Sequence, residues 1–254
     1  SMIAYSENEE LVLLSGIDPK KIGMITWIGT IRKLAAIGFP CVEPAGFHGR
    51  KPAEVAKLLA DLNLTAPSAH YGLPLGDAKN EIIETALELG HRYLITGVPP
   101  GGQDDYTSTD QVKAIAEQYC IAADNVASHG LQVGYHNHDW DLAEFEAQPA
   151  YHTFLAHTPE SVLFEADLFW IARAGIDPVG FLHEIGPRGK VIHFKDGHIT
   201  DRSIEIPYLP AGQGEVDLIA AAKAANDAEY NTVAHEDYEA AVLQAVQKRY
   251  LSLA

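Results

Sequence analysis

Imidazole and carboxylate side chains gather in one short stretch of the chain, residues 134–141. The sequence there reads Gly-Tyr-His-Asn-His-Asp-Trp-Asp and directly follows the apolar run Leu131-Gln132-Val133. Imidazole and carboxylate ligands together suit Zn, Mn, Fe or Co. A cluster of this kind, placed directly after a short apolar run, is typical of a metal site at the end of a buried strand.

Three further clusters repeat this pattern later in the chain. They are Phe164–Asp167, His193–Asp196 and His235–Asp237, and each directly follows a short run rich in apolar residues. Four strands that each end in residues able to bind a metal indicate one site, assembled at one end of a barrel.

The elements that would position these clusters alternate along the chain. Short β-branched runs alternate with longer helical patterns, which is typical of βα units around a parallel sheet. Eight strands are predicted, at Ile22–Trp27, Cys41–Pro44, Thr65–His70, Tyr93–Gly97, Gln132–His136, Val162–Asp167, Val191–Lys195 and Thr232–Glu236. Helices are predicted near Ile28–Ile37, Pro52–Leu62, Asn80–Leu89, Thr109–Ser128, Ala150–His157, Pro178–Ile185 and Asp217–Ala225, and after Glu239.

Eight βα pairs within 254 residues favour the α/β class and one closed (β/α)8 TIM barrel, a single domain over residues 1–254. An open doubly wound sheet is disfavoured because no Gly-x-Gly-x-x-Gly turn follows the first strand. Long loops begin at Pro99 and Gly197, after the fourth and seventh strands. Both should open onto the face where barrel active sites form.

Composition narrows the class of protein. The net charge of −17 argues against general affinity for nucleic acid, whose phosphates would be repelled. No apolar run approaches the roughly 20 residues needed to span a bilayer, and no signal-peptide pattern opens the chain. Cys41 and Cys120 lie far apart in the sequence and are expected to be reduced thiols, so a cytoplasmic location is predicted. The composition is compatible with a homo-oligomer.

Seven segments, in the same order, resemble the sugar phosphate isomerase/epimerase family with the xylose isomerase-like TIM barrel. The segments are Val42–Phe47, Ser68–His70, Gly134–His138, Glu165–Trp170 with Ala174–Pro178, His193–Asp196, Gly212–Asp217 and Glu236–Asp237. The family also includes inosose dehydratases, ketose epimerases and hydroxypyruvate isomerases. The resemblance therefore implies the fold more closely than the substrate.

The resemblance also implies one divalent metal ion (Mn, Mg, Zn, Co or Fe) at the ends of the last four strands. The usual Glu, Asp, His and Glu ligands of the family correspond to His136, Asp167, His193 and Glu236. The chain departs from the family at His136, where relatives have Glu, and His138 is the alternative ligand there. His235 is the alternative at the last strand. Glu236 is preferred because a carboxylate balances the charge of the ion and can act as a base.

Further roles are predicted around this metal. Glu236 is the leading base, and Lys195, Glu43 or His70 would return the proton, with Glu43 and His70 placed opposite the metal side. Glu165 is expected to support a neighbouring histidine. Contacts to the substrate are predicted for His138, Trp140, Trp170 and His198.

The predicted function is metal-dependent isomerisation or epimerisation of a sugar or polyol, through an enediolate formed by proton abstraction next to a carbonyl. A lyase on the same barrel, dehydrating a keto-inositol or cleaving a 3-keto-glycoside, is the main alternative. An endonuclease-like barrel is disfavoured by the acidic charge, and a sugar-binding barrel without a metal is a further alternative. Gly212-Gln213-Gly214 resembles a phosphate cradle, although the family has a turn there.

Overall fold

A computed structural model describes residues 27–99 except 33 and 37, residues 101–204, residues 208–209 and residues 211–227. The predicted strand Thr232–Glu236 and most of Ile22–Trp27 lie outside the described residues. His235 and Glu236 also lie outside this part of the chain. The described residues therefore cover the second to the seventh βα units of the predicted barrel.

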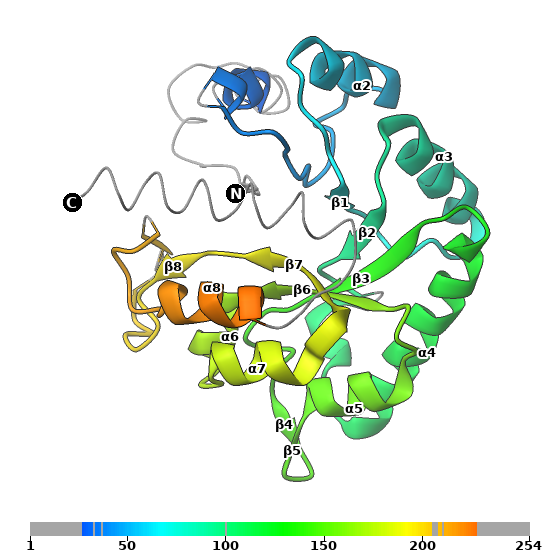
Figure 1. The fold of residues 1–254 in the computed structure, drawn as a ribbon. Helices are drawn as coiled ribbons and strands as arrows, with labels where there is room; N and C mark the ends of the chain where they lie inside the picture. Colours follow the sequence, from blue (N-terminus) through cyan, green and yellow to red (C-terminus); the bar gives the residue numbers. More distant parts are fainter. Residues whose placement is uncertain are drawn as a thin grey trace.

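A curled parallel sheet forms the centre of the described structure (Figure 1). Its strands are β1 (Ser68–His70), β2 (Tyr93–Thr96), β3 (Gln132–His136), β6 (Leu163–Asp167) and β7 (Gly189–His193), paired in the order β1-β2-β3-β6-β7. Parallel strands bring all their carboxyl ends to one edge of the sheet, where the active sites of such folds form. The clusters that follow the strands in sequence therefore meet at this edge.

Helices cover the outer, convex side of the sheet (Figure 1). They are α2 (Pro52–Asp61), α3 (Lys79–Leu89), α4 (Thr109–Ala127), α5 (Ala150–His157), α6 (Leu168–Arg173), α7 (Pro178–Ile185) and α8 (Leu218–Asp227). Three short 3-10 helices also occur, η2 (Gly76–Ala78), η3 (Gly102–Asp105) and η4 (Gly186–Arg188). Two small hairpins pair β4 (Glu144–Phe145) with β5 (Gln148–Pro149) and β8 (Asp196–Gly197) with β9 (Tyr208–Leu209).

The core lies between the sheet and these helices. Helix α4 shows the underlying pattern, because its buried residues Val112, Ile115, Tyr119 and Val126 recur at three-, four- and seven-residue spacing. All five residues of β6 are buried, which is typical of a strand covered on both faces. Burying one large apolar side chain contributes roughly 1.5–3 kcal/mol, so this interface holds the strand ends in place.

The predicted helices within the described residues agree with the structure more closely than the predicted strands near the start of the chain. The helices Ala150–His157 and Pro178–Ile185 are confirmed with the predicted bounds. The strand predicted to end at Trp27 is wrong at that residue, since residues 27–32 are helical. A short apolar run does not distinguish a strand from a helix. The predicted strand Cys41–Pro44 is reduced to one isolated bridge, between Cys41 and Thr65.

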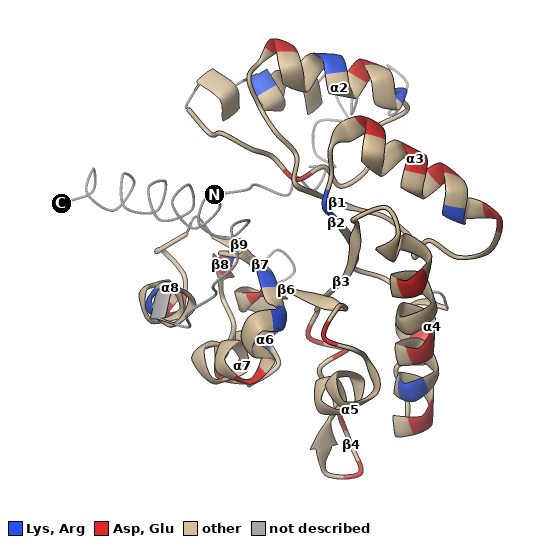
Figure 2. Cartoon of the chain, turned by 45° about the vertical axis from the view of Figure 1, so that its right-hand side comes forward, with Lys and Arg blue, Asp and Glu red and all other residues tan. Residues whose placement is uncertain are grey.

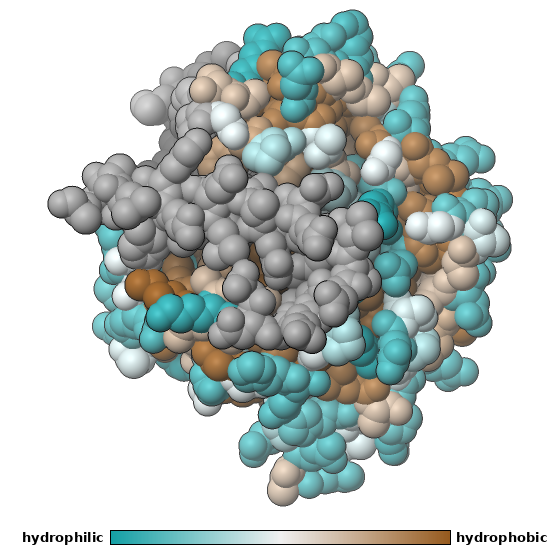
Figure 3. Space-filling view, viewed as in Figure 1, coloured by the Kyte–Doolittle hydropathy of each residue, from teal (hydrophilic) through white to brown (hydrophobic). Residues whose placement is uncertain are grey.

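The described surface is dominated by acidic and other hydrophilic groups. Asp and Glu residues, coloured red in Figure 2, recur along the outer helices α3 and α4. On the coloured part of the face shown in Figure 3, hydrophobic areas lie between hydrophilic ones. None of the described helices combines the length and apolar character that crossing a bilayer requires.

Candidate metal centre

Strand register brings the predicted metal-binding residues together. His136 at the end of β3 pairs with Glu165 of β6, and Asp167 at the end of β6 pairs with His193 at the end of β7. Glu165 and Asp167 share one face of β6, because side chains alternate with a period of two along a strand. Three adjacent strands therefore deliver imidazoles and carboxylates to the same place.

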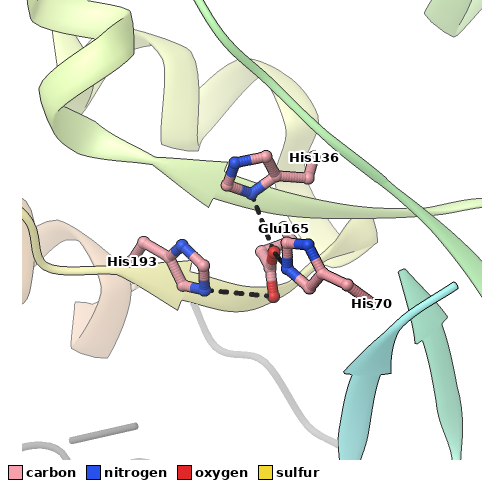
Figure 4. Close-up of side chains that lie close together, drawn as sticks. All are labelled: His70, His136, Glu165 and His193. Atoms are coloured by element: carbon pink, nitrogen blue, oxygen red, sulfur yellow. Dashed lines mark hydrogen bonds and ion pairs between the residues drawn. The ribbon is translucent and has the colours of Figure 1, made fainter. Parts of the chain in front are cut away.

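The carboxylate of Glu165 lies at the centre of this group (Figure 4). Its Oε2 atom is 2.9 Å from Nε2 of His70 and 2.8 Å from Nδ1 of His136. Its Oε1 atom is 3.4 Å from Nε2 of His193. Each of these four residues offers one ligand atom, and these atoms all lie within 4.8 Å of one another. The group His70, His136, Glu165 and His193 is called the histidine cluster below.

Glu43 also reaches the histidine cluster, which corrects the expectation that Glu43 and His70 lie opposite the metal side. Oε2 of Glu43 is 2.8 Å from Nε2 of His193 and 3.9 Å from Nε2 of His70. The sheet is curled tightly enough for residues at the ends of the second and third predicted strands to face those on β6 and β7. Distance along the chain gave no indication of this contact.

Unpaired polar atoms in the histidine cluster and on the neighbouring Glu43 fit a bound cation. Among the described residues, Oε1 of Glu43, Oε1 of Glu165 and Nδ1 of His136 are buried without a hydrogen-bond partner. Nδ1 of His136 is within ion-pair distance of Glu165, yet the two groups do not form a hydrogen bond. Buried polar groups are normally hydrogen-bonded. Carboxylate oxygens and imidazole nitrogens that converge without such partners can instead act as ligands of a divalent ion.

Burial and mutual charge set the protonation of the cluster. Burial lowers the pKa of His136 to about 4, so its ring is neutral, as a metal ligand must be. Burial alone would raise the pKa of Glu165, but His193, His136 and His70 hold it well below its usual value. Burial and the charge of Glu165 raise the pKa of Glu43. The central carboxylate is therefore ionised and attractive to a cation.

Burial and the neighbouring carboxylates shift the pKa of His193 in opposite directions. Burial would lower its pKa, but Glu165, Asp167 and Glu43 together raise the pKa well above its usual value. The raised pKa means that the His193 ring carries a second proton. A bound cation would displace this proton, because a metal binds the neutral imidazole.

Asp167 is held by its backbone and by its own helix. Its Oδ1 atom caps α6 by accepting the N–H groups of Phe169 and Trp170. Asn137 clamps its backbone, since the amide oxygen accepts the N–H of Asp167 at 2.9 Å and the amide nitrogen donates to its C=O at 3.3 Å. The other oxygen of Asp167, Oδ2, lies 3.7 Å from Nδ1 of His193. Asp167 thus faces the side of His193 opposite to Glu165.

Lys195 occupies a cage of aromatic rings beside Asp167. Its Nζ atom is 4.2 Å from the ring centre of Tyr208, 4.6 Å from that of Trp170 and 5.4 Å from that of Phe169. Oδ2 of Asp167 lies 3.8 Å away. Burial lowers the pKa of Lys195, and the charge of Asp167 opposes this shift. The cation is therefore held at the edge of the site by the rings and one carboxylate.

The other predicted substrate contacts divide into two groups. The His138 ring lies 5.3 Å from the Trp140 ring and 5.9 Å from the Trp170 ring, and it meets the His136 ring at 4.9 Å. These side chains form one wall beside the histidine cluster. His198 lies instead on the loop after β7, where its Nδ1 is 3.5 Å from Oε1 of Glu215. The structure pairs His198 with this loop carboxylate.

The glycine-rich loop of residues 212–214 already binds an anionic group of the chain itself. The buried carboxylate of Asp196 accepts the backbone N–H groups of Gly212 and Gly214 through Oδ2, and those of Gly197 and Val216 through Oδ1. A Cβ atom at position 214 would lie 2.2 Å from this carboxylate, so only glycine fits there. The loop is a turn closed on Asp196, and these amides are not available to a phosphate.

A family model described as the xylose isomerase-like TIM barrel matches residues 31–248, which is most of the chain. The chain belongs to this family. Its α/β fold is therefore the TIM barrel of the xylose isomerase-like type, and the described sheet and helices form part of that barrel. The family identity agrees with the resemblance found in the sequence.

Solved structures of xylose isomerase-like barrels share the fold at low sequence identity. A sugar phosphate isomerase/epimerase from Parabacteroides distasonis is 17% identical, with a TM-score of 0.58 over 84% of this chain and 92% of that one. The probable 3-DHS dehydratase AsbF from Bacillus anthracis is 15% identical, with a TM-score of 0.62 over 91% and 95%. An L-ribulose 3-epimerase is 16% identical, with a TM-score of 0.59 over 80% and 72%. No curated protein matches the chain.

Proposed function

We propose that this xylose isomerase-like barrel is a metal-dependent enzyme that isomerises or epimerises a sugar or polyol by removing a proton next to a carbonyl. The observation that carries the proposal is the convergence of three imidazoles on the buried carboxylate of Glu165 at the carboxyl edge of the sheet. When bound there, a divalent ion would act as a Lewis acid and stabilise the charge of the enediolate.

The histidine cluster supports a revised ligand set. His136 and His193 belong both to this cluster and to the set that the family resemblance implies. Glu165 lies among the ligand atoms, whereas Asp167 contacts the far nitrogen of His193. Carboxylates in this outer position orient metal-binding histidines. We therefore assign Glu165 to the metal and Asp167 to the support of His193, the reverse of the roles expected from the sequence.

This donor set also bears on the identity of the ion. Imidazole ligands suit Zn and Fe, whereas Mg and Mn favour carboxylate and water oxygens. Three imidazoles and one carboxylate therefore favour Zn, Co or Fe among the ions that the family resemblance implies.

Glu236 is the proposed base, and Glu43 or Lys195 is the proposed group for returning the proton. His70, which the sequence offered as a third such group, belongs to the histidine cluster and is assigned to the metal instead. Glu43 contacts His193 and His70 of this cluster, which supports its place beside the reacting carbons. Lys195 would supply a cation at the rim, next to the aromatic wall of Trp170.

A lyase is the second candidate because of the same histidines. Loss of water or of a glycosidic leaving group needs an acid beside the carbon next to the enediolate, and His138 lies beside the cluster without belonging to it. The structural similarity to a 3-DHS dehydratase agrees with this alternative. Appearance of an enone during turnover of a keto-inositol would identify the lyase.

Metal analysis combined with a deuterium-exchange screen tests the proposal. Purified protein is expected to contain one divalent ion per chain and to exchange a carbon-bound hydrogen in a ketose, keto-inositol or keto-glycoside in heavy water. A chain that binds no metal and exchanges no substrate would contradict the proposed function, and it would favour a sugar-binding barrel instead.

Replacing His193 with alanine is expected to remove both the metal and the deuterium exchange. His193 belongs to the revised ligand set and also to the set that the family resemblance implies. The readouts are metal content by elemental analysis and exchange by mass spectrometry. His152→Ala is the matched control, since this histidine is paired with Glu184 on the surface at 2.7 Å, away from the cluster. Metal retained at wild-type level in His193→Ala would refute the assigned site.

A further inference from the structure

The imidazole of His138 lies beside the histidine cluster but is not one of its four members. It meets the ring of His136 edge-on at 4.9 Å, stacks on Trp140 with an interplanar angle of 13°, and lies 5.9 Å from Trp170. Contacts with three rings leave this imidazole little freedom to rotate. The His138 ring is therefore held in a defined orientation beside the proposed reacting centre, where it can contact a substrate.

A fully buried carboxylate, Asp141, lies behind the His138 ring. Both of its oxygens accept the backbone N–H of His138, at 2.9 and 3.0 Å, and Oδ2 is 3.6 Å from the ring atom Nδ1. Within the described part of the chain, Nδ1 of His138 is buried and has no hydrogen-bond partner. Catalytic hydrogen bonds are often long before a substrate binds and tighten when it does.

The proximity of Asp141 selects one tautomer of the neutral ring. A neutral imidazole carries its proton on one nitrogen and offers a lone pair on the other. A carboxylate beside Nδ1 keeps the proton there, which leaves Nε2 as an acceptor. Burial raises the pKa of Asp141 to about 6, with hydrogen bonds from His138 and Tyr135 opposing the shift, so the carboxylate is ionised above neutral pH.

Gly97, directly after β2, shows that the His138 ring shares a space with the cluster. A Cβ atom at this position would lie 3.7 Å from Cε1 of His138, 3.3 Å from Cδ2 of His136 and 3.7 Å from Nδ1 of His70. Three imidazole rings therefore converge on a residue that has no side chain. The His138 atom that borders this shared space is Cε1, which is bonded to Nε2 as well as to Nδ1.

We propose that His138 binds a substrate hydroxyl as a hydrogen-bond acceptor through Nε2, and that Asp141 is the positioning residue that fixes this tautomer. The inference rests on the proposed function and narrows its substrate class to compounds with a free hydroxyl near the reacting carbonyl. A site built to bind a hydroxyl discriminates strongly against analogues that lack it. We expect roughly 10–100-fold discrimination against the corresponding deoxyfluoro compound, because it has no donor and leaves one buried acceptor unpaired.

The tautomer is measured first, without any substrate. Protein labelled with ¹⁵N-histidine and loaded with zinc is studied by NMR at pH 8. The resonances of His138 are assigned as those that are missing from the spectrum of His138→Gln. Wild-type protein is expected to carry the proton on Nδ1, and Asp141→Asn is expected to move it to Nε2. Asp139→Asn is the matched control, because that carboxylate pairs with Arg173 and Arg202 instead. A proton on Nε2 in the wild type, or no change in Asp141→Asn, would overturn the role of Asp141.

The substrate contact is measured second, as the ratio of kcat/KM for the free-hydroxyl compound to that for its deoxyfluoro analogue. The compound is the one identified by the deuterium-exchange screen. The ratio is expected to fall at least tenfold in Asp141→Asn. In that variant Nε2 carries the proton, so it donates a hydrogen bond and no longer needs a donor on the substrate. An unchanged ratio together with a changed tautomer would refute the hydroxyl contact. Absence of exchange in the wild type would instead refute the proposed function, and the tautomer result would stand independently.

Discussion

Replacing Glu165 with glutamine is expected to abolish metal binding and deuterium exchange while preserving the fold. The change keeps the shape of the side chain but removes the negative charge at the centre of the histidine cluster. Loss of a residue that only supports a ligand typically weakens metal affinity about 10–100-fold, and loss of a charged ligand should exceed this range. Elemental analysis after dialysis and a zinc competition titration measure the effect.

Asp167→Asn is the matched control for Glu165→Gln, because it makes the same chemical change two residues away on the same face of β6. Asparagine can still cap α6, so the helix should persist. We expect this variant to keep measurable metal, with affinity reduced about 10–100-fold. The opposite ranking, with metal lost from Asp167→Asn and kept in Glu165→Gln, would restore the ligand set that the family resemblance implies.

Replacing Asp196 with alanine is expected to lower the free energy of unfolding by about 3–5 kcal/mol. The carboxylate is buried and accepts four backbone N–H groups of the loop after β7, and alanine leaves all four without this acceptor. Each hydrogen bond to a charged group contributes roughly 1.5–3 kcal/mol, and water would compensate part of the loss. Urea denaturation followed by circular dichroism gives the value.

Asp217→Ala provides the comparison for Asp196→Ala. Asp217 is exposed and accepts one N–H group, that of Ala220 in α8, at 2.9 Å. Loss of such a cap typically lowers the free energy of unfolding by about 1 kcal/mol. Equal losses in the two variants would mean that the Asp196 carboxylate does not hold the loop together.

Much of the site was predictable because parallel strands obey simple geometry. His136 and His193 were placed at strand ends from apolar runs followed by polar clusters, and the structure places both there. The contact of Glu43 with His193 was not predictable, since the sequence does not state how tightly the sheet curls. A prediction of proximity across a barrel needs the strand register as well as the strand order.

The roles of Glu165 and Asp167 show a second limit. Strand periodicity puts both on one face, but it does not tell which of them a neighbouring backbone will engage. Asp167 immediately precedes α6, which is absent from the helices predicted from the sequence, and its Oδ1 atom is occupied by capping that helix. An acidic residue directly before an apolar helical turn is a recognisable cap, and this pattern distinguishes Asp167 from Glu165.

The amide of Asn137 joins the end of β3 to the end of β6 by two hydrogen bonds to the Asp167 backbone. The link ties the strand end that carries His136, a proposed ligand, to Asp167, which supports the proposed ligand His193. A rigid spacing between the strand ends that carry the ligands disfavours ions whose preferred bond lengths do not match that spacing. We expect the barrel to rank divalent ions by radius, and we expect Asn137→Ala to flatten that ranking.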